Sequence, residues 1–242
     1  MASRPARPSR GSVLGVALGV AAACSAGVWV CWRVFVRTAG GQRLDQLALV
    51  GARHGRTRLW QYAEQVLEPV SVGYVALVLL ATVAIAVARR RWWMAAQVAV
   101  LMVGANVTTR LLKYEVLDRP SFGWGQAANT LPSGHTTAAA SASAALLFVV
   151  TPRARPWVAV LGAGYTFATG WSTLIGQWHR PSDVVAAVLV TTAWFALACA
   201  LMVLMPGTTT TATAALPTVV RRTPTRVVRA GLVVVAMLGA GA

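Results

Sequence analysis

Two of the three histidines in this 242-residue chain stand in short polar stretches between long apolar runs. One stretch, residues 172–183, reads STLIGQWHRPSD and places Asp183 four positions after His179. That spacing lets a carboxylate reach an imidazole across one helical turn, and Pro181 predicts that a helix begins there. A carboxylate on one ring nitrogen fixes the tautomer and makes the other nitrogen a better nucleophile. The pair therefore predicts a nucleophilic histidine; the alternative is that Asp183 only complements the helix dipole.

The other stretch, residues 131–136, reads LPSGHT and contains His135. A glycine-containing turn that leads into a helix near Thr136 presents unpaired backbone N–H groups and the positive end of the helix dipole, which together favour an anion. Ser133 adds a hydroxyl donor and His135 a titratable proton. The turn predicts a site that holds a phosphate and protonates a departing oxygen, although four residues in this order also arise by coincidence.

A third stretch, residues 113–120, reads KYEVLDRP. It contains Lys113, the only lysine in the chain, and ends in Arg119 and Pro120. The two cations stand at the end of an apolar run, where they suit a phosphate group. The alternative is a pair of long side chains that reach from the membrane edge to water.

The composition is that of an integral membrane protein, because 57% of the residues are hydrophobic, 12% are charged and the mean hydropathy is +0.61. Long apolar runs predict an all-α protein with six transmembrane helices, near residues 12–36, 70–88, 92–107, 136–150, 157–175 and 184–205. Polar or small residues in the runs from 92 and 136 predict packing against protein. The first run also fits a secretory signal, since arginines precede it.

The connection between the first two spans contains two segments, 44–50 and 59–67, whose apolar spacing fits short interfacial helices. A plain connector is the alternative. The whole chain divides into a cytoplasmic tail, 1–11, two transmembrane helices with an extracytoplasmic loop, 12–91, a catalytic core, 92–205, and a basic low-complexity tail with a short apolar end, 206–242.

The net charge of +16 comes from arginines that cluster beside the spans, where they act as topology signals and contact anionic lipid heads. Nucleic acid is therefore not an expected partner. With a cytoplasmic N-terminus, the clusters near 4–10, 89–91 and 153–155 share one side and both histidine stretches face the other. We expect a multi-pass protein of the inner or plasma membrane with an extracytoplasmic site.

Together the three stretches resemble the motifs of the type 2 phosphatidic acid phosphatase (PAP2) family, whose membrane branch contains lipid phosphate phosphatases and whose soluble relatives include vanadium haloperoxidases. The resemblance covers roughly residues 92–205 and rests on Lys and then Arg-Pro, on Pro-Ser-Gly-His, and on a serine followed at fixed distances by His and Asp. It implies a haloperoxidase-like helical bundle within the six-helix layout.

Carried over residue by residue, the resemblance implies that His179 attacks phosphorus to form a phosphohistidine, that Asp183 orients His179, and that His135 protonates the leaving alkoxide. It also implies that the phosphate oxygens are held by four further groups, namely Lys113, Arg119, Ser133 and the Gly134 backbone. No cofactor is expected, and the chain has too few carboxylates for a two-metal site.

Two positions depart from the family pattern. Five residues separate Lys113 from Arg119 where six are usual, and Thr173 stands where an arginine is usual. One residue fewer rotates a helical side chain by about 100°, so Arg110, one turn earlier, is a possible substitute for Lys113. Arg180 is a possible substitute for the missing arginine, provided that its side chain folds inward.

The expected activity is hydrolysis of a phosphomonoester or pyrophosphate on a membrane lipid, such as phosphatidic acid or a polyprenyl pyrophosphate. Two alternatives remain open: a phosphotransferase that passes the group to an alcohol, and a family member without catalytic activity. Vanadate-dependent oxidation is a more distant possibility. The sequence predicts no oligomeric state.

Overall fold

The computed structural model describes residues 9–53, 56–67, 72–125 and 128–204, and every regular element in these ranges is helical. Two of the α-helices, α1 and α5, continue into short π-helical turns, η1 and η3. In chain order the elements are α1 (Arg10–Cys31), η1 (Trp32–Val36), α2 (Ala39–Ala52), α3 (Arg56–Leu67), α4 (Val72–Ala88), α5 (Trp92–Leu111), η3 (Leu112–Val116), α6 (Gly134–Val149), α7 (Arg155–Ile175) and α8 (Pro181–Leu204). The predicted tail 206–242 lies outside the described residues.

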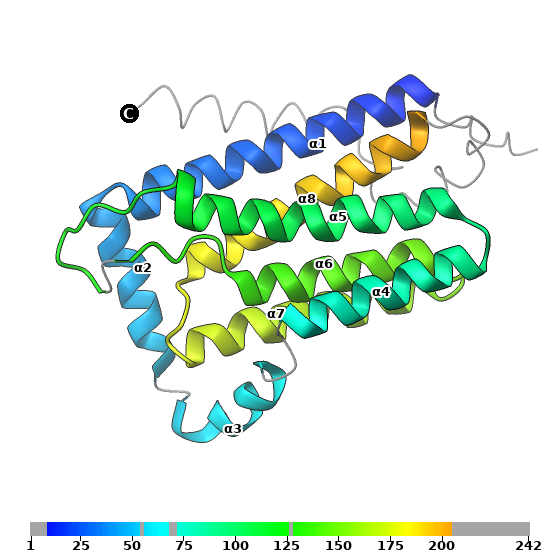
Figure 1. The fold of residues 1–242 in the computed structure, drawn as a ribbon. Helices are drawn as coiled ribbons and strands as arrows, with labels where there is room; N and C mark the ends of the chain where they lie inside the picture. The colour runs from blue at the N-terminus through cyan, green and yellow to red at the C-terminus, as the bar shows by residue number, and fades with distance from the viewer. Residues whose placement is uncertain (1–8, 54–55, 68–71, 126–127, 205–242) are drawn as a thin grey trace, which may run out of the picture.

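The long helices lie roughly side by side, and α2 crosses one end of the bundle (Figure 1). Helix α1 packs along α8, α6 packs along α7, and α5 contacts both α6 and α8. The shorter helix α3 packs against α7. Helices α2 and α3 cover the two segments that were predicted as short helices in the first connection.

Four helical segments are long and apolar enough to cross a membrane: Arg10–Val36, Trp92–Val116, Arg155–Ile175 and Pro181–Leu204. Helix α4 is apolar but shorter, and α6 has 16 residues. The structure therefore supports a membrane protein with four candidate spans among its described residues, and the predicted count of six is not reached by length and composition alone.

Helix α5 is longer than the predicted span 92–107. The prediction ends there because a run of polar residues begins at Asn106. Those residues find partners on neighbouring helices: the Asn106 side chain donates to Ser141 Oγ at 3.0 Å, and Trp194 Nε1 donates to Thr108 Oγ1 at 3.0 Å. The hydroxyls of Thr109 and Thr137 lie 2.9 Å apart. Satisfied polar groups are compatible with a buried helix, so the helix continues to Leu111.

Small residues let α6 pack closely, as predicted. The helix buries most of its Ala, Ser and Thr positions between Thr136 and Ala145. Its far end joins the core that α5 and α8 share, where Leu101, Met102 and Phe148 are almost fully buried.

Helix α2 is fixed against the functional end of the bundle by buried polar contacts. Asp45 is 3% exposed, and its carboxylate accepts the Ser182 backbone N–H at 3.1 Å and the Ser182 hydroxyl at 2.6 Å. Gln42 donates to the carbonyls of Val36 and Pro120. The start of α8 and the loop after η3 are therefore both tied to α2.

We predict that Asp45→Ala lowers the thermal stability of the detergent-purified protein. The substitution leaves two buried donors of Ser182 without an acceptor, at an expected cost of about 1–3 kcal/mol. The matched control is Asp118→Ala, which removes an exposed ion pair with Arg37 worth ~0–1 kcal/mol. Equal shifts of the unfolding temperature in the two variants would contradict this assignment.

Candidate active site

The three motif stretches meet at the end of the bundle that α2 crosses (Figure 1). This end contains the connection from Leu117 to Ser133, the N-terminus of α6, the turn after α7 and the N-terminus of α8. The N-termini of α6 and α8, the positive ends of two helix dipoles, thus lie in one region.

His179 and Asp183 form a buried pair. His179 Nδ1 lies 3.3 Å from Asp183 Oδ2, and the two residues are 5% and 1% exposed. Helix α8 begins at Pro181, which confirms the predicted start and places Asp183 in the first turn. The carboxylate also accepts the Arg180 backbone N–H at 2.9 Å, so it both caps the helix and orients the imidazole. With Nδ1 engaged as a donor, Nε2 carries the free lone pair.

The turn before His179 is fixed by backbone contacts. The N–H groups of Trp178 and His179 both donate to the Thr173 carbonyl, at 3.0 and 3.3 Å. Gln177 adopts a left-handed conformation, with φ 62°, and its side chain donates to the Leu49 carbonyl of α2 at 2.7 Å. The imidazole is therefore held by its backbone as well as by Asp183.

His135 faces His179 across the site. Their ring centroids are 6.1 Å apart in an edge-on arrangement, and the Trp178 ring lies 5.4 Å from His135. Burial lowers the pKa of His135 below its ordinary value, and proximity to His179 and Lys113 lowers this pKa further. A proton on this imidazole is thus readily given up.

Ser133 and Gly134 form the start of α6. Ser133 is the N-cap: its hydroxyl oxygen accepts the Thr136 N–H at 3.3 Å and the Thr136 hydroxyl at 3.0 Å. Its backbone N–H donates to the Asp183 carbonyl at 3.0 Å, which couples the two motif stretches. Open space lies in front of Gly134, where an added Cβ would meet nothing within 4 Å. The predicted hydroxyl donor therefore also has a structural task in the helix cap.

Lys113 lies in the π-helical turn η3 and is half-buried. The shortened spacing between Lys113 and Arg119 predicts a rotated Lys113 side chain only if this segment is a regular α-helix. A π-helical turn has more residues per turn, so that prediction does not apply here. The electrostatic effect of Lys113 on His135 places its charge near the histidines. Arg110, the suggested substitute, is exposed instead, with its guanidinium 5.6 Å from the Tyr114 ring.

Arg119 and Arg180 approach the site from two loops. Arg119 is half-buried, and its guanidinium donates to the Trp124 carbonyl at 3.3 Å. Burial and the nearby Arg180 charge lower the pKa of Arg119, while Asp183 and Asp45 act in the opposite direction. An arginine stays charged under such shifts.

The Arg180 side chain is folded inward, since the residue is 3% exposed and Nη1 donates to Thr130 Oγ1 at 2.8 Å. It lines a cavity of about 320 Å³ together with Trp178, Thr130, Gln46 and Arg53. Thr173, in contrast, is fully buried and donates its hydroxyl to the Gly170 carbonyl at 2.7 Å. Position 173 therefore contributes a carbonyl that holds the His179 turn and no charge.

Sequence reasoning missed two residues that organise this site. The pKa of Asp45 is raised by burial and by Asp183, while the Ser182 hydrogen bonds and Arg180 lower it. Asn129 donates to the carbonyls of Lys113, Leu117 and Leu131 and accepts the Leu131 N–H. The rarity of acidic residues was a usable signal for Asp45, whereas nothing in the sequence singles out Asn129.

The arrangement can accept and transfer an anionic group. It combines an imidazole with a free Nε2, a second imidazole at proton-transfer range through a bound group, two helix N-termini and three cations. In the described ranges, no three His, Cys, Asp or Glu residues gather in a way that could hold a metal ion.

Comparison with known families agrees with this geometry. Residues 94–206 match the sequence model of the PAP2 superfamily, and the match contains both histidines, Asp183, Lys113 and Arg119. Neither the comparison with curated proteins nor that with solved structures gave a match. Residues 94–206 are therefore a domain of the PAP2 superfamily.

Proposed function

We propose that this protein is a membrane lipid phosphate phosphatase that hydrolyses a phosphomonoester or pyrophosphate bond through a phosphohistidine, without a metal. Membership of the PAP2 superfamily supports a phosphatase-type activity in general. The observation that carries the finer proposal is the buried pair in which Asp183 engages Nδ1 of His179 while His135 faces the same imidazole.

In the first half-reaction, Nε2 of His179 attacks phosphorus and an N–P bond forms as the P–O bond to the leaving group breaks. His135 gives its proton to the departing oxygen. In the second half-reaction, a water attacks phosphorus, and a new P–O bond forms as the N–P bond to His179 breaks. His135 takes the proton from that water, and inorganic phosphate leaves. Asp183 stabilises the positive charge that develops on His179.

Charge on the three equatorial oxygens of the transferred group requires preorganised cations and N–H donors. Lys113, Arg119 and Arg180 supply the cations in this proposal, and the N-terminus of α6 at Gly134 supplies the backbone donors. Arg180 takes the place of the arginine that position 173 lacks, because its side chain is buried and its charge acts on Arg119.

We further propose that α4 and α6 cross the membrane together with the four longer candidates, which gives six spans. The arginine clusters at 89–91 and 153–155 lie at the bundle end opposite the site (Figure 1). By the positive-inside rule, this supports our proposal of a site at the extracytoplasmic face of the plasma or inner membrane. At head-group level the site meets a lipid phosphate without extracting the lipid.

A phosphotransferase is the second candidate, because the same phosphohistidine can pass its group to an alcohol. Adding a lipid alcohol acceptor and analysing the products separates the two reactions. A catalytically inactive family member is the third candidate. Only Thr173 favours it, because this buried, uncharged residue stands where an arginine is usual.

We predict that the purified protein releases phosphate from phosphatidic acid or a polyprenyl pyrophosphate in detergent micelles with a chelator present. His179→Asn should abolish release while it leaves the unfolding temperature within a few degrees of the parent. Release that requires an added metal, or that persists in the variant, would rule out the histidine mechanism.

We predict that Arg180→Ala weakens inhibition by inorganic phosphate by about 10–100-fold, since a charge-assisted hydrogen bond is worth ~1.5–3 kcal/mol. The matched control is Arg110→Ala, whose guanidinium lies over the exposed Tyr114 ring and should leave the inhibition constant unchanged. Similar inhibition constants in both variants would remove Arg180 from the phosphate site, and unfolding temperatures measured in parallel would reveal a purely structural loss.

We predict that His135 sets the high-pH limit of activity. Its pKa is lowered, so the protonated acid form disappears as pH rises through a value below the ordinary histidine pKa of about 6.5. The kcat/KM of the parent should fall along that limb, and His135→Asn should lose the limb together with about 10²–10⁴-fold in rate. The phosphate group of the substrate also titrates, but it does so equally with both proteins and cannot cause a difference between their pH profiles. An identical pH profile in the variant would contradict the acid role.

A further inference from the structure

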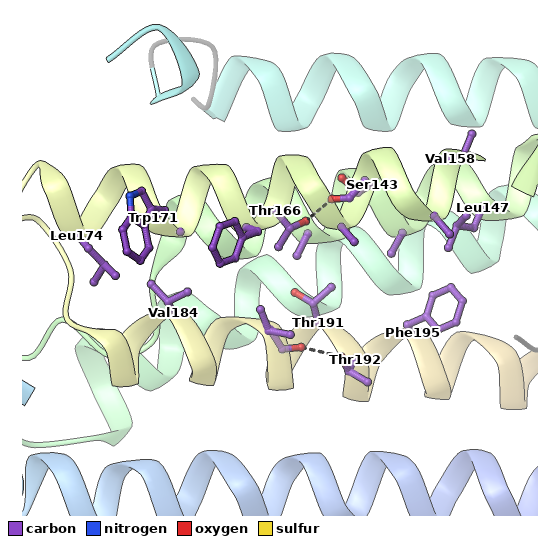
Figure 2. A pocket seen from close by; sticks show the side chains of 18 residues that line it. Ser143, Leu147, Val158, Thr166, Trp171, Leu174, Val184, Thr191, Thr192 and Phe195 are labelled. Atoms are coloured by element: carbon purple, nitrogen blue, oxygen red, sulfur yellow. Dashed lines mark hydrogen bonds between the residues drawn. The ribbon is translucent and has the colours of Figure 1, made fainter. Parts of the chain in front are cut away.

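An apolar groove of about 480 Å³ lies between α6, α7 and α8. We call it the α7 groove. It extends from Leu174, Trp171 and Val184 at one end to Val158, Leu147 and Phe195 at the other (Figure 2). None of the residues that line it is charged. Such a surface offers nothing to a polar ligand and suits a hydrocarbon chain.

Three threonine hydroxyls along the groove are already hydrogen-bonded within their own helices. Thr166 donates to the Gly162 carbonyl and Thr192 to the Val188 carbonyl, both at 2.8 Å (Figure 2). Thr191 donates to the Ala187 carbonyl at 3.0 Å. These three hydroxyls need no hydrogen-bond partner from an occupant, so an alkyl chain in the groove would leave none of them unsatisfied.

One end of the groove adjoins the candidate active site. A Cβ added to Gly170, which lines the groove, would lie 2.7 Å from Val184 Cγ1 and 3.7 Å from Thr136 Oγ1. Val184 follows Asp183 directly, and Thr136 follows His135. Leu174 follows Thr173, whose carbonyl accepts the His179 N–H. The groove therefore begins beside the two stretches that contain His135 and His179.

The groove follows two helices that are candidate membrane spans, α7 and α8. Leu174 follows Val158 by sixteen positions, which correspond to about 24 Å of α-helix. That length exceeds half of the roughly 30 Å hydrocarbon thickness of a bilayer. Trp171 and Phe167 on its rim are 49% and 69% exposed, so the groove is open sideways to the surrounding lipid.

We infer that the α7 groove binds the hydrocarbon chain of the lipid phosphate whose head group reacts at His179, an inference that rests on the function proposed above. A single groove accommodates one chain, and its length exceeds that of one membrane leaflet. The groove therefore favours a phosphate carried on one long chain, such as a polyprenyl phosphate or pyrophosphate, over a lipid with two chains of leaflet length.

The test compares kcat/KM for hexyl, dodecyl and long polyprenyl phosphates in groove-filling variants. Ala163 and Ala159 line the groove about 16 Å and 22 Å of helix from Leu174. Ala163→Phe should lose at least 10-fold on the polyprenyl phosphate and keep parental activity on hexyl phosphate. Ala159→Phe, nearer the far end, should lose less. Val160→Phe adds similar bulk on the same helix, at a residue 68% exposed and outside the groove lining, and should match the parent.

An equal loss on short and long substrates in Ala163→Phe, or no loss on either, would overturn the inference and would indicate that bulk lipid or another segment fills the groove. Absence of phosphate release by the parent protein would instead count against the proposed function.

A polyprenyl phosphate with a photoreactive group at the far end of its chain tests the groove without turnover. Labelling of α7 and α8 groove residues that Ala163→Phe reduces supports the inference, and labelling elsewhere overturns it.

Discussion

The hydrogen bond between His179 and Asp183 is the contact on which the site depends. Asp183 is 1% exposed and lies in the first turn of α8, where a carboxylate is stabilised by the helix dipole and by the Arg180 N–H. Its backbone carbonyl accepts the Ser133 N–H, so the residue that orients one histidine also fixes the start of the helix that bears the other. A buried charge with these partners cannot move without leaving several groups unpaired.

Electrostatics explain why the chain concentrates its few acidic residues here. The protein has 22 basic and 6 acidic residues, and two of the acidic ones, Asp45 and Asp183, are buried beside Arg180. These carboxylates partly neutralise the cations that surround the site. The remaining positive charge attracts a phosphate and so offsets the free-energy cost of removing that phosphate from water.

The helical class and several boundaries could be predicted because they follow from local signals. Pro181 marks the start of α8 and the Pro-Ser-Gly-His turn marks the start of α6. The continuation of α5 past Asn106 could not be predicted, since the partners of its polar side chains come from α6 and α8. The number of membrane spans also depends on more than length, as the 16-residue α6 illustrates.

The candidate site was predicted to the extent that its residues belong to the three motifs. Their spatial convergence and the inward position of Arg180 arise from tertiary packing, which sequence spacing does not encode. The same holds for Asp45, which is distant in sequence from Ser182, and for the α7 groove, which three helices create together.

The most direct test of the central claim is to trap the phosphoryl group during turnover and to locate it by phosphorus NMR and peptide mapping. The account predicts a phosphohistidine at His179, with phosphorus on Nε2, because Asp183 occupies Nδ1. Phosphorus on Nδ1, on His135 or on a residue other than histidine would contradict it.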